Sequence, residues 1–153
     1  MAHYHATVGS RRSADETFGY MAAFSNAAEW DPGVLAGDQL DPGPLRVGSR
    51  FRLVVSFLGR HLPLTYSITD YAPHHEVVLV ATSRLLRSTD RIVVTPADAG
   101  ASVSYDANIQ LRGPLRLLDP LMSRGFRSVA DRATAGLART LSAAPAPQRT
   151  PGP

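Results

Sequence analysis

Three side chains in the middle of the chain have the chemistry needed for proton transfer. Tyr66, Asp90 and Tyr105 each lie in a stretch where apolar and polar residues alternate. Each of the three occupies one of the positions that are otherwise apolar. Such a stretch folds as a strand with one buried face, so all three polar groups are expected to point inward. A carboxyl group buried without a partner has a raised pKa and can act as an acid or base. The alternatives are structural: Asp90 caps a turn or pairs with Arg87, and each tyrosine hydroxyl bonds to a neighbour.

Other catalytic patterns are missing from the sequence. His3 and His5 share one face of a short strand and His74 and His75 lie in a turn, but no third ligand has a spacing suited to zinc. There is no cysteine, so thiolate sites and disulfides are excluded. No serine lies in a nucleophile elbow, and no glycine-rich loop could hold phosphate. We therefore expect neither a metal nor a cofactor.

Composition favours a single globular domain. The chain has 153 residues, 44% of them hydrophobic and 19% charged, which suffices for one core but not comfortably for two. The net charge is only +3, and the arginines are spread along the chain rather than clustered with aromatic residues. Nucleic acid is therefore not an expected partner. No apolar run is long enough to cross a bilayer and no signal peptide is visible, so we expect a cytoplasmic location.

The elements that must position the candidate groups follow from local patterns. Ser13 and Glu16 have the spacing of a capping box and predict a helix over 14–23. Asn26 begins a second short helix, which Pro32 ends. Alternation between turn residues predicts antiparallel strands with one wet face. The strands are expected over 3–8, 34–40, 50–57, 62–69, 77–81, 90–95 and 102–111.

After residue 114 the hydrophobic period changes from two to about four, which predicts a long helix with one apolar stripe. Pro120 is expected in the first turn of this helix or at a restart within it. The segment 143–153 is rich in Ala and Pro without periodicity and is predicted to be a disordered tail. The folded domain is thus expected over 1–142.

This element order predicts an α+β fold, with a curved antiparallel sheet of about seven strands wrapped around the long helix. The two short helices fall between the first and second strands, and the long helix should cover the concave face of the sheet. The helix carries small residues, namely Gly125, Ala130, Ala133 and Gly136, which would leave room for a cavity. The alternative is that bulky sheet residues close the gap: Phe51, Phe57, Tyr66 and Tyr105.

The same segments resemble the START-like helix-grip superfamily, also called SRPBCC, in its polyketide cyclase/dehydrase and coenzyme-Q-binding-like branch. The most specific part of the resemblance is Trp30 followed by Pro32, Gly33 and Val34 after two short helices. The resemblance extends to about residue 142, and the segments that carry it are 13–18, 24–34, 47–51, 92–96 and 100–105.

The resemblance implies a deep pocket between sheet and long helix, in which relatives hold lipids, quinones, polyketides or hormones. Our leading hypothesis is therefore a protein that binds a hydrophobic small molecule or lipid. Trp30 is either an aromatic wall of this pocket or a core anchor. The predicted lining residues are Phe18, Phe24, Trp30, Phe51, Leu53, Leu64, Tyr66, Leu79, Ile92, Tyr105, Phe126, Val129 and Ala133.

Two alternatives from other functional classes stay open. One is an enzyme of the aromatase, cyclase or dehydratase type that uses Tyr66, Asp90 or Tyr105 for proton transfer. The resemblance implies a polar arginine in cyclase pockets, yet Arg50, Arg52 and Arg91 occupy outward-facing positions of their strands. The other alternative is a protein-interaction module of the same fold. The sequence predicts no oligomeric state.

Overall fold

The computed structural model describes residues 2–143, so the predicted tail lies almost wholly outside the described residues. The strands are β1 (Ala2–Ser10), β2 (Val34–Gln39), β3 (Arg50–Phe57), β4 (Arg60–Ala72), β5 (Glu76–Thr82), β6 (Leu86–Ala97) and β7 (Gly100–Leu111). The helices are α1 (Ala14–Ala22), the 3-10 turn η1 (Phe24–Asn26), α2 (Ala27–Trp30), the 3-10 turn η2 (Gly113–Leu118) and α3 (Asp119–Ser142).

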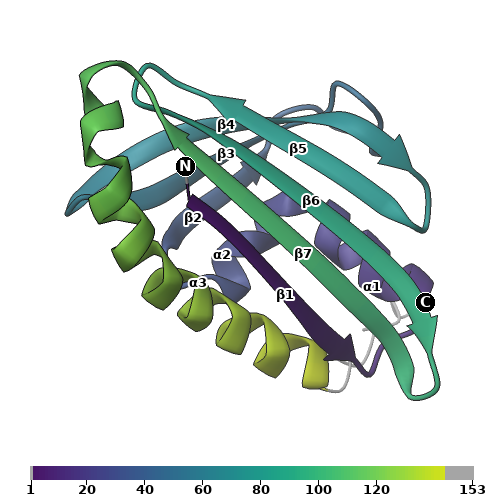
Figure 1. Ribbon diagram of the computed structural model, residues 1–153. Helices are drawn as coiled ribbons and strands as arrows, with labels where there is room; N and C mark the ends of the chain where they lie inside the picture. The colour runs from purple at the N-terminus through teal and green to yellow at the C-terminus, as the bar shows by residue number, and fades with distance from the viewer. Residues whose placement is uncertain (1, 144–153) are drawn as a thin grey trace.

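The seven strands form one antiparallel sheet in the order β1-β7-β6-β5-β4-β3-β2. Figure 1 shows the sheet curling strongly, with α3 running beside β1 and the short helices lying on the same side of the sheet. Register shifts interrupt the ladder in β2 and in β4, and such bulges increase the local bend. The predicted α+β helix-grip fold is confirmed.

Most strands follow the predicted alternation, with one difference that matters for the site. The β6 strand begins at Leu86, four residues before the predicted start at Asp90. Leu86 and Ser88 are both buried on the inner face. The polar Ser88 at an inward position obscured the alternation, because a buried serine is not distinguishable from a turn residue by pattern alone.

The first short helix begins as its sequence predicts, whereas Asn26 makes no side-chain cap on α2 and instead ends the 3-10 turn η1 that precedes it. The Ser13 hydroxyl accepts a hydrogen bond from the Glu16 amide at 3.2 Å. The Glu16 carboxylate accepts one from the Ser13 amide at 3.4 Å, which completes the capping box. The α1 helix buries Phe18 and Met21. The α2 helix ends at Trp30, and the next residue, Asp31, has an extended backbone as expected for a residue preceding proline.

The long helix is confirmed, and η2 leads directly into it with Pro120 in its first turn. The α3 helix is tightly packed only from Ala130 onward, where Ala130, Leu137 and Leu141 are buried. Hydrogen bonds from the Tyr4 hydroxyl to Asp131 and from the Thr134 hydroxyl to Tyr4, each 3.0 Å, tie β1 to this helix. Among the helices of residues 2–143, none is both long and apolar enough to span a membrane.

Candidate functional site: an apolar cavity with an acidic interior

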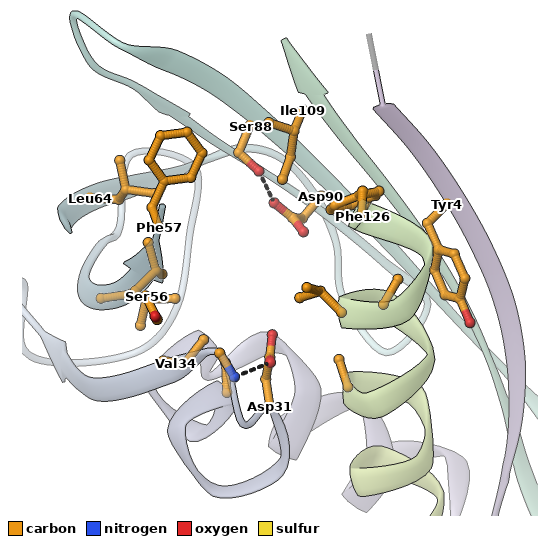
Figure 2. A pocket seen from close by; sticks show the side chains of 18 of the residues that line it. Tyr4, Asp31, Val34, Ser56, Phe57, Leu64, Ser88, Asp90, Ile109 and Phe126 are labelled. Carbon is orange, nitrogen blue, oxygen red and sulfur yellow. Dashed lines mark hydrogen bonds between the residues drawn. The ribbon is translucent and has the colours of Figure 1, made fainter. Parts of the chain in front are cut away.

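A cavity of about 480 Å³ lies between the sheet and residues 121–137 of α3. Its walls come from the inner faces of β1, β3, β4, β6 and β7, from the segment 24–34 and from one side of α3. Figure 2 shows lining side chains converging on an open centre from the sheet, the helix and the turn after α2. This size and predominantly apolar wall are typical of small-molecule sites.

The structure brings nine of the thirteen predicted lining residues to this cavity. They are Phe24, Trp30, Leu53, Leu64, Tyr66, Tyr105, Phe126, Val129 and Ala133. The small residues Gly125 and Ala130 also line it, as expected, whereas Gly136 does not. Contact of these residues with a ligand stays a prediction.

The other four predicted lining residues lie outside the cavity. Phe51, Leu79 and Ile92 are fully buried, and Phe18 is 3% exposed. Phe18 packs against Tyr71, with ring centroids 5.7 Å apart. All four belong to the closed core, because the segment with α1 and η1 covers that part of the concave face. Strand alternation identified the correct face but not the position along it.

Exposed leucines and a valine rim the opening of the cavity. Leu58 is 61% exposed, Leu118 41%, Leu121 72% and Val129 44%, and all four also line the interior. Leu58 holds a positive φ of 49° in the tight turn between β3 and β4, and its side chain belongs to the rim. The interior can therefore be reached from solvent between this turn and the start of α3.

Asp90 is the central polar group of the cavity wall. It is 4% exposed, and its carboxylate accepts hydrogen bonds from the hydroxyls of Ser88, at 2.9 Å, and Tyr105. These contacts follow from the β6–β7 register, which pairs Ile92 with Tyr105 and so places the tyrosine diagonally beside Asp90. The expected inward orientation is observed, and the alternative pairing with Arg87 is not.

Burial sets the protonation chemistry of this cluster. Loss of water raises the pKa of Asp90 from 3.8 to about 6, against the opposing effect of the hydrogen bonds from Tyr105 and Ser88. Burial, with the nearby Asp90 charge, raises the pKa of the Tyr66 and Tyr105 hydroxyls, so both stay neutral near pH 7. The cluster thus holds one titratable group close to neutrality.

Asp31 is a site residue that the sequence analysis missed. It follows Trp30 directly, and its Oδ1 accepts the Gly33 amide at 2.8 Å. Burial raises the pKa of its carboxyl group. Figure 2 shows its carboxyl group pointing across the cavity toward Asp90. The sequence signal is its position beside the only tryptophan of the chain, within the segment 24–34 that carries the family resemblance.

Two pairs of aromatic rings pack in the cavity wall. The Trp30 and Tyr105 rings meet edge to face at 5.8 Å, and the Phe24 and Tyr66 rings do so at 5.0 Å. Trp30 is 5% exposed and also lines the cavity, so it is both a core anchor and part of the wall.

The remaining candidate groups lie elsewhere. His3 and His5 approach Asp106 at 3.5 and 2.8 Å, while His74 contacts Asp15, so the two histidine pairs do not meet. Over residues 2–143, no three His, Cys, Asp or Glu residues are grouped for metal binding. Arg50 pairs with Asp41 and Arg91 with Glu76 on the outer face, as their strand positions predicted.

A curled antiparallel sheet closed by a long helix over an apolar cavity defines the START-like class of proteins. The sequence model of the family described as polyketide cyclase/dehydrase and lipid transport matches residues 1–142, and the chain belongs to this family. No curated protein sequence matches the chain.

Solved structures share the fold at low sequence identity. A START superfamily protein from Mycobacterium smegmatis is 13% identical with a TM-score of 0.74, over 92% of this chain and 97% of that one. The Zhui aromatase/cyclase from Streptomyces sp. R1128 is 16% identical with a TM-score of 0.69, over 91% of this chain and 90% of that chain. The di-domain aromatase/cyclase BexL of the BE-7585A biosynthetic pathway is 21% identical with a TM-score of 0.66, over 94% of this chain and 50% of that chain.

Proposed function

We propose that this protein binds a hydrophobic small molecule or lipid in the cavity between the sheet and α3. The observation that carries the proposal is an apolar cavity of about 480 Å³ that opens to solvent through an apolar rim. Burial of apolar ligand surface supplies the affinity, at roughly 25 cal/mol per Å² before the costs of association. The Asp90 cluster supplies orientation.

Filling the cavity should abolish this binding. Ala133→Phe places an aromatic ring in the cavity from α3, and we expect the affinity for N-phenyl-1-naphthylamine, a hydrophobic fluorophore, to fall at least about tenfold. Ala135→Phe is the matched control, because Ala135 lies on the same helix but is exposed and does not line the cavity. Fluorescence titration of the three proteins makes the comparison. Equal affinities in both variants would place the fluorophore outside the cavity.

A second candidate function is catalysis of proton transfer on a polyketide-like substrate, as in an aromatase, cyclase or dehydratase. It is favoured by Asp90, which is buried, titrates near neutrality and shares a hydrogen bond with Tyr105. An enzyme would lose turnover in Asp90→Asn or Tyr66→Phe while still binding substrate. A pure binder of neutral ligands would be unaffected by either change.

A protein-interaction module is the third possibility. Such a module would keep its partner in Ala133→Phe, because that change alters the interior and not the outer surface. The cytoplasmic location and the lack of a nucleic-acid partner stay predictions.

A further inference from the structure

The polar groups inside the cavity are acidic or neutral. Asp31 from the end of α2 and Asp90 from β6 face one another across the open centre (Figure 2). Among the described residues that line the cavity there is no Arg, Lys or His. With no protein cation in the lining, the ionised Asp90 carboxylate leaves the apolar site with an unbalanced negative charge at neutral pH.

The two carboxyl groups retain capacity to accept further hydrogen bonds. One carboxylate oxygen of Asp90 accepts a hydrogen bond from the Ser88 hydroxyl, and the other accepts one from the Tyr105 hydroxyl. Each carboxylate oxygen can accept two hydrogen bonds. Within residues 2–143, the Gly33 amide is the one donor to the Asp31 side chain, on Oδ1. Both residues line the cavity, where a ligand with several N–H donors would satisfy their free acceptor positions.

The surroundings favour a cation over other donors. An ionised carboxylate in an apolar cavity is costly unless an opposite charge accompanies it. The Tyr105 hydroxyl bonds to Asp90 and the Trp30 ring meets the Tyr105 ring edge to face, so aromatic rings capable of cation–π contact lie in the wall near Asp90. A ligand carboxylate would add a further negative charge to the same space.

We propose that the cavity selects hydrophobic molecules that carry a protonated amine, with the ammonium group between Asp31 and Asp90 and the apolar part against Phe57 and Leu64. This inference rests on the proposed binding function and names its ligand class. The positive net charge of the chain, +3, would by itself favour anions, so a preference for amines must come from the cavity.

A matched series of ligands tests the inference. Decylammonium, decanol and decanoate share one alkyl chain, and isothermal titration calorimetry at pH 7.5 gives their affinities. We expect decylammonium to bind about tenfold or more tightly than decanol, and decanoate to bind most weakly. Asp31→Asn and Asp90→Asn should each lower the affinity for decylammonium about tenfold and leave the affinity for decanol nearly unchanged. Asp38→Asn removes one negative charge from the exposed face of β2 and should change none of the affinities.

The pH profile adds an independent check. Decylammonium affinity should fall as the pH drops through about 6, where Asp90 becomes protonated. The groups that face Asp90 are Asp31, Ser88, Tyr66 and Tyr105, and the two tyrosines stay neutral because burial raises their pKa. The decanol affinity should not change over the same range.

The outcomes separate the inference from the proposed function. Decylammonium binding no tighter than decanol, or equally tight in Asp31→Asn and Asp90→Asn, would overturn the amine preference. If N-phenyl-1-naphthylamine still binds in a manner sensitive to Ala133→Phe, the binding function itself survives. Failure of all these compounds to bind would contradict both.

Discussion

Replacing Gly136 by alanine should destabilise the protein by about 3 kcal/mol or more, although alanine is the better helix former. The α3 helix crosses α2 at this point, and a Cβ on Gly136 would lie far inside van der Waals contact with the Trp30 carbonyl oxygen. That oxygen belongs to the backbone and cannot rotate away, so the helices must separate. Separation would also shift Trp30 in the cavity wall.

The matched control is Gly125→Ala in the same helix. A Cβ on Gly125 would meet no atom within 4 Å, so this change should stabilise the protein by about 0.5–1 kcal/mol. Urea denaturation of both variants measures the difference. Equal stabilities would mean that α3 does not approach α2 as closely as the structure indicates.

Replacing Asp90 by asparagine should stabilise the protein at pH 7.5 by up to about 3 kcal/mol, which would raise Tm by roughly 5–10 °C. The pKa of Asp90 is about 6 in the folded protein against an ordinary value of 3.8, so the folded state binds more protons between these pH values. Folding stability therefore falls as the pH rises from 4 to 6, and the wild type carries the full cost at neutral pH. Asparagine can still accept the Tyr105 hydroxyl without bearing a charge.

The gain in stability from Asp90→Asn should shrink as the pH is lowered. It should vanish below about pH 4, where Asp90 is protonated in both the folded and the unfolded protein. Thermal unfolding at several pH values measures this, with Asp38→Asn as the control for loss of an exposed charge. A gain that persists at low pH would show that it does not come from the cost of burying the charged Asp90 carboxylate. A costly buried carboxyl group is typical of a residue kept for function rather than for stability.

The fold was predictable because its signals are local. The capping box at Ser13 and Glu16, the alternation along β3, β4 and β7, and the change of period after residue 114 each predict one element. Asp90 was found because strand parity alone orients it inward. These signals need no knowledge of the tertiary packing.

The details of the site depend on tertiary packing and could be predicted only in part. Phe51 and Leu53 lie on the same face of β3, yet Phe51 belongs to the closed core and Leu53 to the cavity. Which one faces the cavity depends on where the short helices end above the sheet. Likewise Gly125 and Gly136 are both glycines of the same helix. Gly125 lines the cavity, whereas Gly136 lies in close contact with the α2 backbone. Asp31 enters the site only because α2 stops one residue before it.

Native mass spectrometry of the protein purified from its own host tests the central claim most directly. We predict a small hydrophobic molecule that copurifies with the wild type and with Ala135→Phe, and that is lost in Ala133→Phe. Denaturing extraction would then identify its chemical class, including whether it carries an amine. A ligand-free mass for the wild type, together with no thermal shift across lipids, quinones, polyketides and hydrophobic amines, would contradict the account.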